Sequence, residues 1–227
     1  MIIYAVVMTI ETRAVAPFLK NGFLVGCDET RAGVLVDPGD EVEELLDLVR
    51  VRQVDVKAIL LTHAHVDHVT GVARAKQVLG APVYLHRDDL FLYEAAVQQG
   101  AMFGLRVEAP PPVDHYFEPG ARLAFGTCEI RVHHTPGHCP GGVCLQIGPA
   151  GAPGTDLFVG DTLFAGSIGR TDLPGGDYAV LMRSITEVLF PLGDACIVHS
   201  GHGPDTTIGH ERQTNPFVLQ YLEDRQA

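Results

Sequence analysis

The segment Leu60–Gly71, with the sequence LLTHAHVDHVTG, constrains this chain more than any other feature. It places three histidines and one aspartate within six positions, directly after an apolar run and directly before a helical pattern. In the extended end of a strand, residues two apart point the same way, so His63 and His65 present their rings to one side. Asp67 and His68 then enter the helix, where the backbone turns their side chains elsewhere. One short segment can therefore serve two neighbouring metal ions.

Three further strand ends repeat this theme. TPGHCPGG places His138 just past a predicted strand, FVGDTLF places Asp161 past another, and SGHGP places His202 past the last. Sites built on a sheet scaffold usually lie at such positions. Five histidines and two aspartates form a mixed nitrogen and oxygen set, which suits zinc, iron or manganese rather than copper(I) or calcium. We predict that all seven side chains converge on one cleft.

The hydrophobic pattern predicts the same arrangement of strands and helices in both halves of the chain. In the first half, strands are predicted over residues 2–10, 21–26, 33–39, 57–63 and 82–86, and helices over 40–54, 67–80 and 87–100. After a Pro-rich connection at 108–122, strands are predicted over 122–126, 128–135, 142–148, 156–161 and 195–200, and helices over 178–190 and 213–225. On pattern alone, two such halves fit either an ordinary α/β domain or an α/β fold in which two sheets pack face to face with helices outside, a four-layer αββα sandwich. The clustered histidines favour the sandwich. We expect residues 1–227 to form a single domain, with no separate C-terminal helical domain.

Composition narrows the classes of function. The net charge of −12 would repel phosphate backbones, so no nucleic-acid partner is expected. The longest apolar runs have the length of a strand, and the N-terminus lacks the features of a signal peptide, so we expect a cytoplasmic protein without a membrane partner. Five cysteines without a Cys-x-x-Cys pair suit free thiols in a reducing compartment. Oligomeric state is not indicated by the sequence.

The order and spacing of these residues resemble the metallo-β-lactamase superfamily, and within it the small bacterial hydrolases of the glyoxalase II (hydroxyacylglutathione hydrolase) type. The resemblance extends from the early VDPG to the late GHGP and implies the αββα fold. It implies a first metal site made by His63, His65 and His138, a second made by Asp67, His68 and His202, and a bridging carboxylate, Asp161.

The resemblance also implies a chemistry. Two divalent ions, Zn2+ above all with iron or manganese as alternatives, would share a water and turn it into a hydroxide nucleophile at neutral pH. The expected substrate is a small thioester, S-D-lactoylglutathione or a similar hydroxyacyl thioester, because a thiolate departs with little need for a protonating acid. Asp161 would act as the bridging catalytic carboxylate, and Asp67 could shuttle a proton while it is ligated.

The segment GSIGRTDLPGGD contains a candidate substrate-binding residue. Arg170 stands where the family has a basic residue that helps to hold the thiol part of the substrate, whereas Asp172 stands where the longer enzymes have a tyrosine. An arginine and an aspartate two residues apart on a loop could bind the substrate or could bind each other. The sequence leaves both alternatives open.

Two other functions compete with the hydrolase. A persulfide dioxygenase on the same fold would hold one iron with the residues that match His63, His138 and Asp161. That enzyme does not use the last histidine as a second-site ligand, so the presence of His202 favours the hydrolase. A metal-dependent binding module should have lost a ligand, and none is missing. We interpret Cys139 as a small buried thiol, and six other histidines as packing or outer contacts: His86, His115, His133, His134, His199 and His210.

Overall fold

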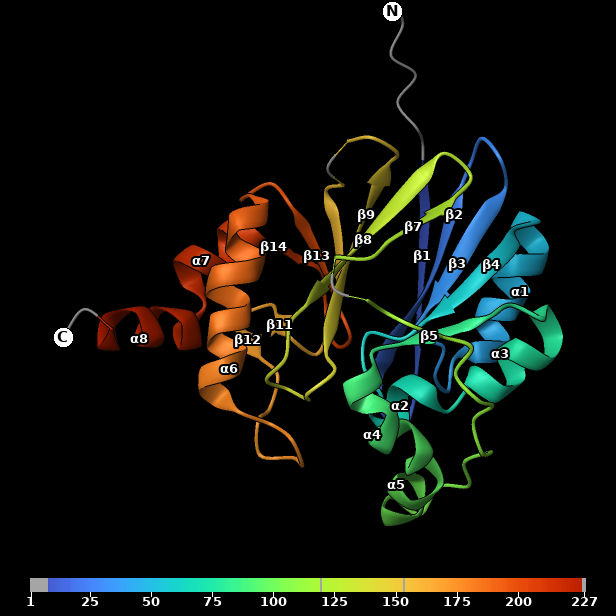
Figure 1. The fold of residues 1–227 in the computed structure, drawn as a ribbon, viewed down its shortest axis with the longest axis horizontal. Coiled ribbons are helices and arrows are strands. Elements are labelled where there is room, and N and C mark those ends of the chain that lie inside the picture. The colour runs from blue at the N-terminus through green and yellow to red at the C-terminus, as the bar shows by residue number, and fades with distance from the viewer. Residues whose placement is uncertain (1–7, 119, 153, 226–227) are drawn as a thin grey trace, which may run out of the picture.

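Two six-stranded sheets pack face to face and helices cover both outer faces in the computed structural model, which describes residues 8–118, 120–152 and 154–225 (Figure 1). The four-layer αββα sandwich expected from the sequence is confirmed. Among the described residues, no helix is long and apolar enough to cross a membrane.

The N-terminal sheet has the strand order β1-β2-β3-β4-β5-β6. Its strands are β1 (Met8–Val15), β2 (Lys20–Cys27), β3 (Ala32–Val36), β4 (Asp55–Leu60), β5 (Val83–Leu85) and β6 (His115–Tyr116). The first three strands pair antiparallel, and β4, β5 and β6 continue in parallel from β3. Parallel pairing requires crossover connections, which the helices between these strands provide.

The C-terminal sheet has the strand order β14-β13-β10-β9-β8-β7. Its strands are β7 (Arg122–Phe125), β8 (Cys128–His134), β9 (Val143–Pro149), β10 (Asp156–Gly160), β13 (Ile197–Ser200) and β14 (Thr206–Thr207). All neighbouring strands are antiparallel except β10 and β13, which run parallel. A small hairpin, β11 (Leu163–Phe164) with β12 (Ser167–Ile168), lies beside this sheet.

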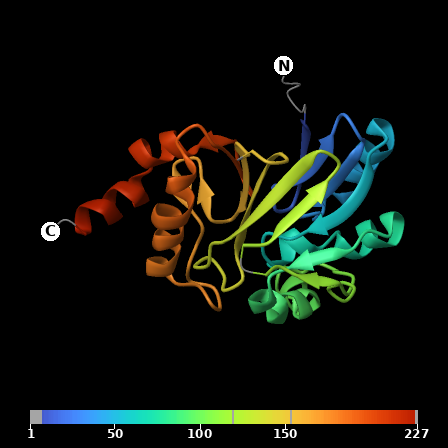
Figure 2. The same ribbon diagram turned by 45° about the horizontal axis from the view of Figure 1, so that its top comes forward.

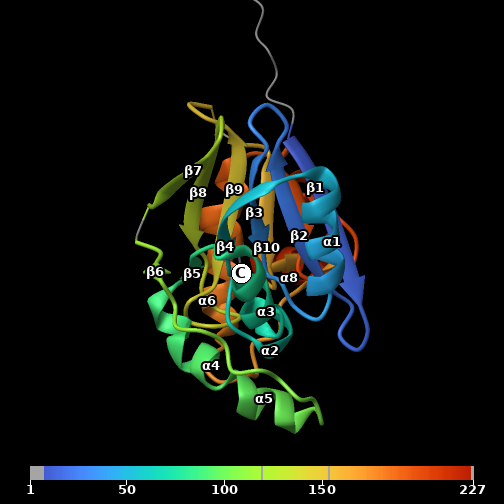
Figure 3. The ribbon, with the colours of Figure 1, turned by 90° about the vertical axis from the view of Figure 1, so that its right-hand side faces the viewer.

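The helices fall into three groups. On the N-terminal sheet lie α1 (Val42–Arg52) and α3 (Val72–Leu79), and on the C-terminal sheet lie α6 (Tyr178–Arg183), α7 (Ile208–Thr214) and α8 (Pro216–Asp224). At one end of the sandwich lie α2 (Val66–Val69), η1 (Arg87–Asp89), α4 (Leu90–Glu94) and α5 (Ala96–Met102). Figure 2 shows helices on both outer sides of the two central sheets. Figure 3 shows α1 against β1 and β2, with α4 and α5 at the lower end.

Three apolar clusters fill the three spaces between the layers. Phe23 from β2 and Phe158 from β10 meet edge to face between the sheets, with ring centroids 5.0 Å apart. The helix α1 buries Leu45 and Val49 on one face against the N-terminal sheet, as its amphipathic pattern predicted. Leu181 of α6 belongs to the cluster that packs against the other sheet. Burying side chains of this kind contributes about 1.5–3 kcal/mol each, so the layers stabilise one another.

Some boundaries differ from the sequence prediction. Residues 2–7 of the first predicted strand lie outside the described residues, and β1 continues to Val15, five residues further than predicted, because it is an edge strand with polar side chains paired along β2. The single helix predicted over 67–80 is wrong, since it divides into α2 and α3 at Gly71. A Cβ at Gly71 would lie only 2.6 Å from Cβ of Val42, so the chain needs glycine there for the start of α3 to approach α1.

Other differences arise from the packing of the helices. The helix predicted over 87–100 is divided into η1, α4 and α5, and the helix predicted over 178–190 begins as α6 and continues as a π-helical segment, η2 (Ser184–Leu189), and a 3-10 turn, η3 (Phe190–Leu192). The Pro-rich connection contains β6, and the helix α7 was not predicted at all.

All five cysteines are buried and free, which confirms the expected free thiols.

Candidate metal centre

The seven predicted side chains lie at the carboxyl ends of strands from both sheets. His63 and His65 follow β4, and Asp67 and His68 lie in α2, which comes next. His138 follows β8, Asp161 follows β10 directly, and His202 lies two residues beyond β13. The structure brings them together as two groups, one of His63, His65 and His138 and one of Asp67, His68 and His202. Within each group, one potential ligand atom per residue lies within 4.8 Å of the others. Their role as ligands remains a prediction.

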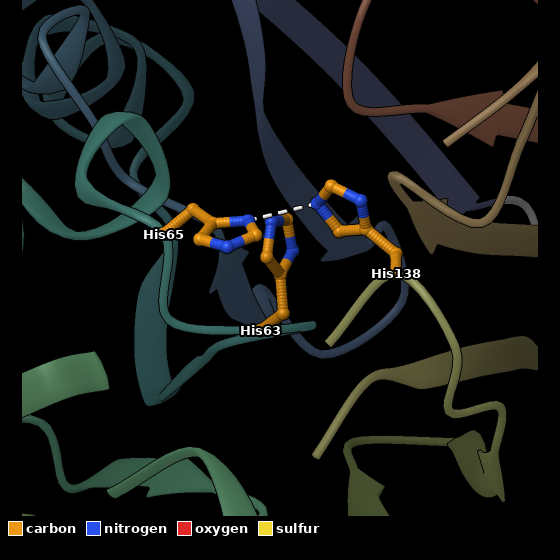
Figure 4. A group of neighbouring side chains, drawn as sticks. All are labelled: His63, His65 and His138. Atoms are coloured by element: carbon orange, nitrogen blue, oxygen red, sulfur yellow. Dashed lines mark hydrogen bonds between the residues drawn. The ribbon is translucent and has the colours of Figure 1, made fainter. Parts of the chain in front are cut away.

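The first group consists of three imidazoles that meet nearly at right angles (Figure 4). Nδ1 of His65 lies 2.8 Å from Nε2 of His138. Nδ1 of His138 donates to the carbonyl of Arg170 at 2.7 Å, and Nδ1 of His63 lies 3.2 Å from Oγ1 of Thr62. These outer contacts hold the Nδ1 atoms of His63 and His138, so their Nε2 atoms are left to face the centre.

The second group joins a carboxylate to two imidazoles. Nε2 of His202 lies 3.1 Å from Oδ2 of Asp67, and Nε2 of His68 lies 3.7 Å from the same oxygen. On its other side, Nδ1 of His68 donates to Oδ2 of Asp37 at 2.9 Å. The ring of His68 is thereby held between one carboxylate behind it and another at the centre.

Asp161 contacts both groups. Its Oδ2 lies 3.7 Å from Nε2 of His138 in the first group and 3.7 Å from Nε2 of His202 in the second. Its Oδ1 lies 3.4 Å from Nε2 of His68. Asp161 is therefore the carboxylate that can connect the two groups.

Burial and mutual charge divide the site into neutral and charged members. Burial, together with neighbouring imidazoles, holds the pKa of His63 well below its usual value and lowers the pKa of His65 to about 4. Burial opposes charge on His68 too, but the carboxylates of Asp67, Asp37 and Asp161 outweigh it and raise its pKa to about 10. The same attraction outweighs burial at Asp67, so the pKa of its carboxyl lies below the usual range. At neutral pH His63 and His65 therefore offer unprotonated nitrogens.

The donor atoms fit divalent metal ions. The buried atoms without a hydrogen-bond partner include Nε2 of His63, Nε2 of His68 and Oδ1 of Asp161. Leaving a polar atom buried and unpaired costs about 1–3 kcal/mol, so native proteins rarely do so without a purpose. Cations bound between the two groups would satisfy these atoms, and imidazole nitrogen with carboxylate oxygen is a ligand set that zinc, iron and manganese accept.

Asp37 is a buried acid beside the candidate ligands that the sequence reasoning did not include. Its side chain is buried and accepts from the backbone nitrogen and Oγ1 of Thr62, at 2.7 and 2.6 Å, as well as from His68. In the sequence, VDPG marks the end of a predicted strand and the start of the family resemblance, with no role assigned to Asp37. The signal was nevertheless present, because Asp37 follows a strand directly, as Asp161 does.

Two further buried acids that the prediction did not include support the site loops. Asp89 accepts from the backbone nitrogens of Ala64 and Gly141, at 3.1 and 2.6 Å, and from the thiol of Cys139 at 3.0 Å. It thereby joins the loop of His63 and His65 to the loop of His138. Cys139 is fully buried, which confirms its interpretation as a packed thiol. Glu41, the second acid, accepts from the buried ammonium of Lys20 at 2.6 Å.

Arg170 and Asp172 bind each other. Nε and one terminal nitrogen of the guanidinium donate to the two carboxylate oxygens, both at 2.7 Å. Both side chains are exposed, and Arg170 also lines the cleft beside the metal centre. A role of Arg170 in binding substrate remains a prediction.

The histidines interpreted as packing residues lie outside the two metal groups. His199 is buried, stacks on Phe158 with ring centroids 4.7 Å apart, and contacts Asp156 and Asp205 at 3.0 Å each. His86 and His134 stack on each other with ring centroids 4.2 Å apart. With Asp88 they form another small group of potential ligands, away from the cleft.

An αββα sandwich that gathers a group of three histidines and a group of one aspartate and two histidines at its strand ends defines a class of candidate metal-binding proteins. The chain belongs to the metallo-beta-lactamase superfamily, whose sequence profile matches residues 16–202.

The proteins to which this chain is similar carry different functional names. It is 38% identical to hydroxyacylglutathione hydrolase GloC of Haemophilus influenzae over 93% of this chain and 98% of that protein. Among solved structures it resembles BLEG-1 B3 metallo-beta-lactamase, with a TM-score of 0.84 and 37% identity over 92% of this chain and 99% of the other. It also resembles TTHA1623 in a di-iron-bound form, with a TM-score of 0.81 and 46% identity over 91% and 99% of the two chains.

Proposed function

We propose that this protein is a dinuclear-metal thioester hydrolase of the glyoxalase II type. Its substrate would be S-D-lactoylglutathione or a similar small hydroxyacyl thioester. The observation that carries the proposal is that two complete ligand groups lie side by side and share Asp161. The similarity to hydroxyacylglutathione hydrolase GloC supports the choice of substrate.

The two groups would hold two divalent ions, which we propose to be Zn2+, with iron or manganese as alternatives. Such a pair of ions supplies a hydroxide nucleophile by lowering the pKa of water from ~15.7 to about 7, and it polarises a carbonyl oxygen. Iron is supported as an alternative by the di-iron-bound form of the similar protein TTHA1623.

The side chains of this protein hold and orient the reacting groups. Asp161 keeps the two groups at a fixed separation, and Asp37 and the Arg170 carbonyl fix the rings of His68 and His138. The carboxylate of Asp67 lines the cleft and is ionised at neutral pH, which is the form that can accept a proton. A thiolate needs little protonation to leave, so a thioester suits a site in which the pKa values of the Asp67 and Asp161 carboxyls lie below their usual range.

Two other reactions are candidates. A persulfide dioxygenase would need one iron held by His63, His138 and Asp161, and the completeness of the second group favours the hydrolase. Hydrolysis of a β-lactam is supported by the similarity to BLEG-1 B3 metallo-beta-lactamase. Its leaving group is an amide nitrogen, which needs a proton more than a thiolate does.

The test is a count of metal ions per chain combined with parallel assays on the metal-loaded protein. Lactoylglutathione, glutathione persulfide and a chromogenic cephalosporin are supplied separately, while thiol release, oxygen uptake and ring opening are followed. We expect two ions per chain, thiol release from the thioester and no oxygen uptake. One iron per chain, with oxygen uptake on persulfide and no thiol release from the thioester, would assign the protein to the dioxygenases.

A further inference from the structure

A cleft of about 380 Å³ opens directly beside the metal centre. His65, Asp67 and His202 are among the residues that line it from the side of the ligand groups. The rest of the lining is largely apolar and includes Phe18, Leu92, Met102, Phe103, Leu173 and Pro174. A volume of this size is typical of small-molecule sites, so the cleft can hold one arm of a substrate whose reacting carbonyl lies at the ligands.

The apolar lining comes from segments that lie far apart in the chain. Phe18 lies in the turn between β1 and β2, Met102 and Phe103 lie at the end of α5, and Leu173 lies in the loop after β12. The rings of Phe18 and Phe103 meet edge to face with centroids 5.4 Å apart. Met102 is 84% exposed and Phe103 is 62% exposed, which leaves large apolar side chains facing solvent beside the ligands. Exposed apolar side chains gathered at a polar site indicate a ligand that covers them.

The polar groups of the cleft outside the ligand groups already have partners. Among the described lining residues, Arg170 is the one Lys or Arg, and the Nε edge of its guanidinium is paired with the Asp172 carboxylate, which offsets its charge. The amide nitrogen of Gln99 donates to the carbonyl of Leu92 at 2.7 Å. The tripeptide of a glutathione thioester presents two carboxylates and one ammonium group. The described lining offers no unpaired cation to bind those carboxylates.

We propose that this cleft selects thioesters that carry an uncharged apolar group, such as a short aliphatic chain or a phenyl ring, on the acyl or the thiol side. The inference rests on the proposed thioester hydrolysis, and it places uncharged apolar thioesters ahead of lactoylglutathione as the preferred substrates. In the reaction, water oxygen bonds to the carbonyl carbon, the carbon–sulfur bond breaks, and the thiolate leaves with the electron pair. The apolar group stays in the cleft throughout, so it contributes to binding and position rather than to bond breaking.

Two substrate series test the proposal on the metal-loaded protein. In the first, the thiol is N-acetylcysteamine and the acyl group is acetyl, butyryl, hexanoyl or benzoyl; in the second, the acyl group is acetyl and the thiol is ethanethiol, butanethiol or hexanethiol. Lactoylglutathione is the reference. We expect kcat/KM to rise by about fourfold per methylene in one series until the cleft is full. The series that rises identifies the arm that occupies the cleft.

Three outcomes separate the two proposals. Turnover of hexanoyl or hexanethiol thioesters with a higher kcat/KM than lactoylglutathione supports the apolar cleft. Faster turnover of lactoylglutathione, with no rise along either series, overturns it and leaves thioester hydrolysis intact. Absence of thiol release from every thioester overturns the proposed function itself.

Variants of exposed residues test the cleft without endangering the fold. Phe103→Ser should lower kcat/KM for the longest substrate of the rising series by about tenfold. For the shortest substrate of that series, the acetyl or the ethanethiol thioester, kcat/KM should fall by less than about twofold. Phe217→Ser, on the exposed face of α8, is the matched control and should change neither. Asp172→Asn should free the Arg170 guanidinium and lower KM for lactoylglutathione severalfold, with little effect on neutral thioesters. Equal effects of Phe103→Ser on long and short substrates would contradict the proposal.

Discussion

The carboxylate of Asp37 accepts a hydrogen bond of 2.9 Å from Nδ1 of His68, so that Nε2 of His68 faces Asp67 and Asp161. The same carboxylate also accepts from Oγ1 of Thr62, whose oxygen lies 3.2 Å from Nδ1 of His63. One buried acid therefore orients a histidine in each of the two ligand groups, although it belongs to neither.

We predict that Asp37→Asn weakens metal binding by about 10–100-fold, the usual effect of losing an outer-sphere carboxylate. Asparagine suits the test because residue 37 has a φ of 48°, a left-handed conformation that asparagine tolerates. Metal affinity is measured by competition with a chelator. Asp47→Asn, on the exposed surface of α1, serves as the control. Equal affinities in wild type and Asp37→Asn would contradict an orienting role.

Replacing Asp161 should affect both metal ions, whereas replacing His202 should affect one. Asp161→Ala removes a carboxylate that contacts both groups, so we expect fewer than two ions per chain and loss of hydrolysis. His202→Ala removes a member of the second group alone, so one ion should remain in the group of His63, His65 and His138. Elemental analysis after dialysis gives the counts. Two tightly bound ions in Asp161→Ala would refute the bridging role.

The charge on His68 predicts how the stability of the metal-free protein depends on pH. Its native pKa of about 10 lies above the value of about 6.5 expected in the unfolded chain. Its contribution to stability is therefore fully present below about pH 6.5 and is lost as the pH rises to about 10. His68→Gln lacks this contribution. Urea denaturation measures the free energies of unfolding of the metal-free wild type and of His68→Gln. The two values should differ more at about pH 6 than at about pH 9.5. A difference independent of pH would show that His68 is uncharged.

The features that the sequence could predict are those in which local spacing determines the geometry. His63 and His65 stand two residues apart in an extended segment, and α1 repeats its apolar residues at helical spacing, so both were recognisable without tertiary information. The convergence of Asp161 and His202 was predicted from their shared position just past strands, and the parallel pairing of β10 and β13 in the structure places both strand ends at one edge.

The features that could not be predicted depend on contacts between distant segments. The break between α2 and α3 arises because Gly71 lies against Val42, about thirty residues earlier in the chain. Asp89 supports the site loops through Ala64 and Gly141, neither of which carries a chemical signature. The apolar cleft is assembled from distant segments whose phenylalanine, methionine and leucine side chains resemble ordinary core residues in a sequence.

A buried ion pair ties the start of β2 to the loop that carries Asp37. Lys20 is 1% exposed, and its ammonium donates to Glu41 at 2.6 Å and to the backbone carbonyl of Asp37. Glu41 also accepts from the backbone nitrogen of Gly39 at 2.8 Å. On the other side of the site, Lys20 forms a backbone bridge with His202. The pair therefore lies between segments that carry an outer-sphere acid and a predicted ligand.

Lys20→Met should destabilise the protein by about 3–5 kcal/mol, because it leaves the carboxylate of Glu41 buried without its cation. The double variant Lys20→Met, Glu41→Gln should recover part of this loss, since the glutamine is uncharged and its side-chain oxygen can still accept from Gly39. Recovery should be incomplete because the carbonyl of Asp37 still lacks the Lys20 donor. Chemical denaturation of the metal-free proteins measures all three free energies of unfolding. If the double variant were no more stable than Lys20→Met, the cost would arise from the lost packing of the lysine chain and not from an uncompensated charge.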